Sequence, residues 1–139
     1  MTARVVDASV AIKWLLPEDH SEAARRLLTE KYALSAPDLL FAEVGNVLWG
    51  RVRWKELTVE RAGLLVASLA AAPLEVHGSA SLVPAALDLA VETGVTVYDA
   101  LYVCLAGVRG ALVTADKKLI ARLRRSRYED RLQFVEDVS

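Results

Sequence analysis

Four acidic residues stand far apart in the chain and together could support metal-dependent chemistry: Asp7, Glu43, Asp99 and Asp116. Oxygen ligands without clustered histidine or cysteine suit a hard cation, and Mg2+ or Mn2+ leaves coordination positions for water and phosphate. Because the chain has one cysteine and two histidines, a zinc site is disfavoured. Such a cation can lower the pKa of a water and neutralise charge on a phosphate, as a nuclease requires. The four acids can do this only if the fold brings them together.

Three of these acids have a second explanation. Asp7, Asp99 and Asp116 each lie at the start of a predicted helix. Aspartate is favoured there because its side chain accepts hydrogen bonds from the free backbone N–H groups of the first turn. Capping alone could therefore account for each aspartate taken singly.

Glu43 has no capping explanation. Its neighbours three and four positions away on a predicted helix are Leu39, Leu40, Asn46 and Val47, so it projects from a largely apolar face. An unpaired carboxylate there costs several kcal/mol, or its pKa rises until it is neutral, unless a cation or strong donors meet it. A salt bridge to an arginine or a solvent-lining helix face would also satisfy it.

Polar neighbours could orient these carboxylates. Ser9 and Thr114 lie two residues from the first and the last of the aspartates, and Asn46 lies about one helical turn after Glu43. Their hydroxyl and amide groups could hold the carboxylates or contact a water at the metal. A second helix cap, a strand end and an amide bonded to a loop carbonyl are the alternatives for these three side chains.

The elements that must position these residues alternate along the chain. Apolar and β-branched runs predict strands at residues 4–6, 32–36, 74–77, 110–114 and 132–135. Helical periodicity and breakers predict helices at residues 10–16, 20–31, 37–54, 58–72, 81–93, 98–108 and 116–125. Strands that alternate with helices favour an α/β fold, with a parallel sheet and helices on both faces. Ligands of such sheets bind beyond the carboxyl ends of the strands, where Asp7 and Asp116 would fall.

Composition is that of one globular domain spanning residues 1–139. The chain is 54% hydrophobic and 25% charged, and its formal net charge is −1. A nucleic-acid partner would therefore need a local basic patch. The single Cys104 excludes an internal disulfide, and neither a signal peptide nor a run long enough to span a membrane is evident. We expect a cytoplasmic protein without a membrane partner.

Four short motifs in order give the chain a family resemblance. They are residues 5–10 (VVDASV), 41–48 (FAEVGNVL), 98–102 (YDALY) and 112–119 (LVTADKKL). With these, the chain resembles PIN-domain proteins nearly from end to end. The opening run at residues 7–18 (DASVAIKWLLPE) and the short length make it similar in particular to the VapC toxins of prokaryotic type II toxin–antitoxin pairs.

The resemblance implies more than the residues alone establish. It implies a three-layer α/β/α fold with a central parallel sheet in the order 3-2-1-4-5, and Mg2+- or Mn2+-dependent endoribonuclease activity. It further implies homodimers, and inhibition by a cognate antitoxin whose tail covers the active site. Asp7, Glu43, Asp99 and Asp116 match the acidic positions of the family one by one, and Thr114 matches its frequent Ser or Thr near the last acid.

Two further groups of residues are candidates for contacts with partners. Seven basic side chains between residues 117 and 131 could bind RNA phosphates, or could simply form a solvated surface: Lys117, Lys118, Arg122, Arg124, Arg125, Arg127 and Arg131. Of these, Lys117 and Lys118 are expected to lie closest to the site. Five large apolar residues near helix ends could form a groove for an antitoxin helix or a dimer contact, although core packing is expected for at least half of them: Trp14, Leu15, Leu16, Trp49 and Trp54.

Other functions fit the pattern less well. A haloacid-dehalogenase phosphatase would need a second aspartate two residues after the first, and this chain has Ser9 there. The remaining alternative is a PIN-like module that binds RNA or protein without catalysis, in which the acids serve as caps and salt-bridge partners. The acidic residue Glu43 argues against that alternative.

Overall fold

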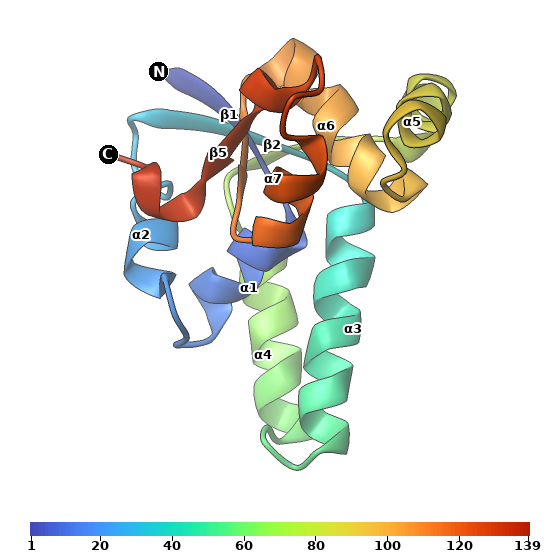
Figure 1. Ribbon diagram of the computed structural model, residues 1–139. Coiled ribbons are helices and arrows are strands. Elements are labelled where there is room, and N and C mark those ends of the chain that lie inside the picture. Colours follow the sequence, from blue (N-terminus) through green and yellow to red (C-terminus); the bar gives the residue numbers. More distant parts are fainter.

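The computed structural model describes residues 1–139 and contains a five-stranded sheet (Figure 1). Its strands are β1 (Thr2–Val6), β2 (Tyr32–Pro37), β3 (Leu74–His77), β4 (Leu112–Thr114) and β5 (Leu132–Phe134). They are ordered β3-β2-β1-β4-β5, and every neighbouring pair is parallel. The order 3-2-1-4-5 that the family resemblance implies is therefore confirmed, and so are the positions of all five predicted strands within a few residues.

Seven α-helices and two short 3-10 turns connect and flank these strands. The helices are α1 (Ala8–Leu15), α2 (Ser21–Arg25), α3 (Leu39–Arg53), α4 (Val59–Ala70), α5 (Ser79–Thr93), α6 (Val97–Arg109) and α7 (Lys117–Leu123). The 3-10 turns are η1 (Glu129–Arg131) and η2 (Val135–Asp137). Helices α3 and α4 form a hairpin that extends away from the sheet, and both chain ends lie on the opposite side of the molecule (Figure 1). The predicted α/β class with helices on the faces of a parallel sheet is confirmed.

One predicted helix is much shorter than expected. The apolar stripe of residues 20–31 indicated a continuous helix, but α2 ends at Arg25, and turns follow until β2 begins. The apolar residues of this segment still face the core, since Ala23, Ala24 and Leu27 are buried. Because Tyr32 already pairs with Thr2 in the sheet, a helix continuing to residue 31 would leave no residues for the turn into β2.

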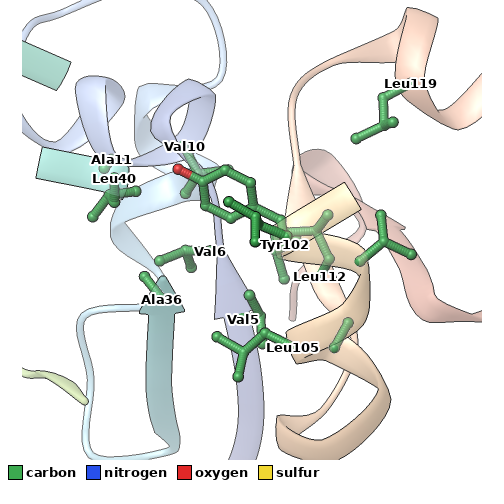
Figure 2. Packing of buried hydrophobic residues seen from close by; sticks show 14 of the residues in the cluster. Val5, Val6, Val10, Ala11, Ala36, Leu40, Tyr102, Leu105, Leu112 and Leu119 are labelled. Carbon is green, nitrogen blue, oxygen red and sulfur yellow. The ribbon is translucent and has the colours of Figure 1, made fainter. Parts of the chain in front are cut away.

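The core lies between the central strands and the helices that cover them. Val5 and Val6 of β1 are fully buried and pair with Leu112 and Val113 of β4. Figure 2 shows these residues packed with Ala36 of β2 and with Tyr102 and Leu105 of α6. Because β1 is the central strand and is buried at its carboxyl end, the residue that follows it is held rigidly.

Helix α6 is the buried helix, as its apolar circumference predicted. Six of its residues belong to the core, and it packs on β1, β2 and β4 as well as on α5. No single helix is long and apolar enough to cross a membrane; α5 and α6 reach that length and composition only as a pair bent by 113°.

The turn from α6 into β4 depends on a glycine. Gly110 has φ of 95° and ψ of 163°, a combination that is essentially restricted to glycine. A Cβ atom at this position would lie 2.1 Å from the carbonyl oxygen of Ala3 in β1. The close approach aligns β4 with β1. It thereby also aligns the turns that follow these two strands, which contain Asp116 and Asp7.

The large apolar residues near helix ends divide into two groups. Trp14, Leu15 and Leu16 pack against the core, so the expectation that at least half of the five do so is confirmed. Trp49 and Trp54 on the α3–α4 hairpin are 57% and 73% exposed.

Candidate active site

Asp7 occupies the turn between β1 and α1 and is the most buried acid of the chain. It is 7% exposed and caps α1, because its Oδ1 accepts a hydrogen bond from the backbone N–H of Val10 at 3.2 Å. Ser9 donates to Oδ1 at 2.6 Å and Thr114 donates to Oδ2 at 2.5 Å. Burial raises the pKa of Asp7 to about 6, although these three hydrogen bonds oppose the shift; the nearby charge of Asp116 adds to it.

The same hydroxyls join the ends of two strands. The backbone N–H of Ala115 donates to Ser9 Oγ at 2.9 Å, and that of Asp116 donates to Thr114 Oγ1 at 3.0 Å. The turn after β1 is thereby fastened to the turn after β4. Ser9 thus holds the carboxylate of Asp7, as its position suggested. Thr114 also donates to Asp7 and not to the carboxylate of its neighbour Asp116, whose backbone N–H it accepts.

Asp116 caps the last helix while keeping one oxygen free. Its Oδ1 accepts hydrogen bonds from the backbone N–H groups of Lys118 at 3.0 Å and Leu119 at 3.1 Å, at the start of α7. Its Oδ2 accepts none within the chain. Capping thus accounts for one oxygen of Asp116 and leaves the other available for a ligand.

Asp99 is not a helix cap, so the capping explanation is wrong for this residue. Helix α6 begins at Val97, and its cap is Thr96, whose hydroxyl oxygen accepts the N–H of Asp99 at 3.1 Å. The carboxylate of Asp99 is half-buried and lines a hollow of about 230 Å3 together with Asp116. Burial, and secondly the charge of Asp116, raises the pKa of Asp99.

Glu43 projects from α3 toward α6 and is held by a residue that the sequence analysis missed. The hydroxyl of Tyr102 donates to Glu43 Oε1 at 2.5 Å, and the tyrosine is 2% exposed. Figure 2 shows the Tyr102 side chain among the core residues. Burial raises the pKa of Glu43, with Asp99 adding to the shift and the tyrosine hydrogen bond opposing it. Asn46 is exposed and makes no hydrogen bond to Glu43.

A sequence signal for Tyr102 does exist. It lies three residues after Asp99, so the two side chains share one side of a helix. Its partner Glu43 is 59 residues away, however, and the pairing becomes visible only when α3 and α6 are placed. Burial and the bond to Glu43 raise the pKa of the Tyr102 hydroxyl, so it stays a donor.

The four acids are neighbours in a row. Asp7 and Asp116, Asp116 and Asp99, and Asp99 and Glu43 are each close enough for the charge of one to raise the pKa of the other. No three carboxylate, imidazole or thiol groups lie close enough together to hold a metal ion by themselves. Open sites that use only a few carboxylates, with water and phosphate completing the shell, are typical of Mg2+. The donor chemistry therefore fits a hard divalent cation.

Comparison with known proteins agrees with this geometry. The family profile described as the PIN domain matches residues 4–125. The chain belongs to the PIN domain family. Ribonuclease VapC3 of Pyrobaculum aerophilum is 39% identical to this PIN domain over 118 residues, which are 83% of this chain and 90% of the relative. Ribonuclease VapC1 of Mycobacterium tuberculosis is 34% identical over 120 residues, 84% of this chain and 88% of the relative.

Solved structures share the fold. The crystal structure of PAE2754 from Pyrobaculum aerophilum superimposes with a TM-score of 0.71 at 26% identity, covering 97% of this PIN domain and 85% of that chain. A toxin–antitoxin complex from Klebsiella pneumoniae superimposes with a TM-score of 0.65 at 13% identity, covering 96% and 98%. At that identity the second likeness concerns the fold alone.

Proposed function

We propose that this PIN domain is a Mg2+- or Mn2+-dependent endoribonuclease and the toxin of a toxin–antitoxin pair. The observation that carries the proposal is the gathering of four carboxylates, from four different elements, at the carboxyl edge of a parallel sheet: Asp7, Glu43, Asp99 and Asp116. Keeping acids that are buried and that repel one another costs stability, which a binding module would have no need to do. The ribonuclease names of the relatives agree with this function.

The proposed mechanism gives each acid a role. Asp99 and the free Oδ2 of Asp116, which share one hollow, would hold the cation beside Asp7, with water and phosphate completing its shell. When bound, the cation would lower the pKa of water and neutralise charge on the phosphate. Ser9 and Thr114 fix the rotamer of Asp7, so its oxygens need no reorganisation when substrate arrives.

Glu43 would act on the attacking water. Its Oε1 is occupied by the Tyr102 hydroxyl, which leaves Oε2 to accept the proton. The raised pKa of Glu43 brings its basicity nearer to neutral pH, as a general base requires. The water oxygen would bond to phosphorus as the bond from phosphorus to the ester oxygen breaks. The departing oxygen would take up a proton from solvent water, and Glu43 would release its proton to solvent.

The proposal includes protein partners. The α3–α4 hairpin has a hollow of about 420 Å3 lined mostly by apolar residues, among them Trp49, Val59 and Val66, and Trp54 is exposed nearby. Apolar surface of this kind accepts an amphipathic helix. A cognate antitoxin and a homodimer are accordingly parts of the proposed function, and the shared fold of a solved toxin–antitoxin complex agrees with the first. The proposal also places the protein in the cytoplasm.

Cleavage of total RNA tests the catalytic part. We expect the parent protein to cleave RNA with Mg2+ or Mn2+ and to stop when EDTA is added. Asp7→Asn and Asp99→Asn should abolish cleavage while the circular dichroism spectrum is unchanged. Glu60→Gln, which removes one carboxylate from the exposed start of α4, is the matched control and should retain the parent rate.

Two results would contradict the proposal. If both aspartate variants cleave at the parent rate, the assignment of the site is wrong. If the parent does not cleave RNA with either cation, the protein is a PIN-like module that binds RNA or protein without catalysis.

A further inference from the structure

The hollow that contains Asp99 and Asp116 also contains two cationic side chains. Lys118 and Arg122 lie four residues apart on α7 and line this hollow of about 230 Å3 together with the acids. Both are exposed, and neither takes part in an ion pair. Positive groups thus stand beside the acids without neutralising them.

Three other basic side chains of the same segment make contacts outside this hollow. The ammonium of Lys117 lies 5.3 Å from the ring centre of Phe134, and Lys117 does not line this hollow, whereas Lys118, the other lysine expected closest to the site, does. Arg127 pairs with Glu92 at 3.1 Å, and Arg131 donates to a backbone carbonyl of α6. Lys118 and Arg122 are the two members of the segment that line the acidic hollow.

The structure holds Arg122 in place without using up its donors. Its Nη1 donates to the carbonyl oxygen of Gly94 at 3.3 Å, in the turn between α5 and α6. Gly94 has φ of 81°, and a Cβ there would lie 3.3 Å from the same Nη1. The guanidinium has five N–H groups in all, so most remain free for an anion. Lys118 is positioned by its backbone N–H, which Asp116 caps.

The lining of the hollow indicates which part of RNA it can accept. Its volume is below the roughly 300–1,000 Å3 of ordinary small-molecule pockets. No aromatic side chain lines it, so it offers no surface on which a base could stack. Arginine and lysine side chains without a neighbouring aromatic ring typically bind the phosphate backbone, and such contacts do not depend on the base sequence.

The negative charge at the site explains why RNA binding would need such a basic subsite. The net charge is −1, and the carboxylates at the site repel a phosphodiester chain. A cation among the acids neutralises only the phosphate that it touches, so neighbouring phosphates need positive groups of their own. We infer that Lys118 and Arg122 bind the RNA phosphate adjacent to the cleaved one and thereby position the strand over Asp99 and Asp116. This inference rests on the proposed function.

A pair of double variants tests the subsite. Lys118→Gln/Arg122→Gln removes both cations of the hollow. Arg124→Gln/Arg125→Gln removes the same charge from the same segment but from exposed side chains that do not line this hollow, and is the control. We measure kcat and apparent KM for Mn2+-dependent cleavage of total RNA, and binding of a fluorescent oligouridylate with Ca2+ in place of Mn2+, over about 50 to 200 mM salt.

The expected results separate a local contact from a general charge effect. The first variant should raise KM about tenfold at nearly constant kcat, and its oligouridylate affinity should fall. Its slope of log affinity against log salt should become shallower by about 0.7, since the two side chains share one phosphate and each neutralised phosphate of a single strand contributes about 0.7. The control should stay within about twofold of the parent in KM.

Other outcomes would overturn the inference. Equal effects in the two double variants would mean that only net charge matters, and unchanged KM and salt slope would mean that the pair does not touch RNA. Because the oligouridylate measurement needs no cleavage, it tests the subsite even if the parent protein proves inactive, so failure of the subsite and failure of the proposed ribonuclease function are distinguishable.

Discussion

Burial of the Asp7 carboxylate should make the metal-free protein less stable at neutral pH than a variant with a neutral side chain at this position. The pKa of this carboxyl rises from 3.8 to about 6. A difference of about 2.2 pKa units, at about 1.36 kcal/mol each, corresponds to about 3 kcal/mol against folding once the group is ionised. At 7% exposure, solvent screening reduces this figure little. Asp7→Asn should therefore raise the free energy of unfolding at neutral pH by up to about 3 kcal/mol.

Asparagine can preserve the local contacts. Its Oδ1 can still accept from Ser9 and from the Val10 N–H, and its amide can donate to the Thr114 hydroxyl oxygen, reversing the direction of that hydrogen bond. The difference between the two proteins is then mainly the charge of the buried carboxyl.

The pH dependence has a definite sign. Between about pH 4 and 6 the unfolded chain has released the proton of Asp7 while the folded protein retains it. The folded state binds more protons in this window, so this group's contribution to stability falls as pH rises and remains low above pH 6. The gain from Asp7→Asn should be near zero below about pH 4 and complete above about pH 6.

Urea unfolding of both proteins in EDTA, at several pH values, measures this gain directly. Equal stabilities at neutral pH, or a difference that does not change between about pH 4 and 6, would refute the reasoning. In a parallel series without EDTA, Mn2+ should raise the melting temperature of the parent and not that of the variant, because only a ligand bound to the folded state stabilises it.

Two other substitutions, with Gly63→Ala as a control for the second, test the supports of the site. Tyr102→Phe keeps the ring but removes the hydrogen-bond donor to Glu43, so kcat should fall several-fold with little change in KM. The pH–rate profile should move to higher pH, because the hydrogen bond from Tyr102 lowers the pKa of Glu43 and its loss raises that pKa. Gly110→Ala should lower the free energy of unfolding, measured by thermal melts, by about 3 kcal/mol or more, because its backbone angles and the Ala3 carbonyl exclude a Cβ. Gly63→Ala should instead raise it by about 1 kcal/mol, because a Cβ at this position within α4 meets no other atom.

The sequence was sufficient for the strands and most helices because each has a clear period and a clear end. Gly94 does end α5, and the strand of residues 4–6 does lead into a cap at Asp7. Helix α2 was overestimated because its apolar stripe continues into turns that still face the core. The length of that helix depends on where β2 must start, which local periodicity does not contain.

Parts of the site that depend on long-range contacts escaped prediction. Asp99 looked like a cap because the true cap, Thr96, lies outside the predicted helix of residues 98–108. Lys117 and Lys118 were both expected near the site, but of the two only Lys118 lines the acidic hollow, while the ammonium of Lys117 lies over the ring of Phe134. Which face of a helix meets a neighbouring element is decided by packing, and packing became visible only in three dimensions.

Calorimetric titration of Mn2+ into the metal-free protein tests the central claim most directly. If the four carboxylates form a divalent-cation site, the parent should bind Mn2+, Asp99→Asn should lose most of that affinity, and Glu60→Gln should bind as the parent does. Binding by Asp99→Asn with the affinity of the parent, or no binding by the parent, would contradict the account.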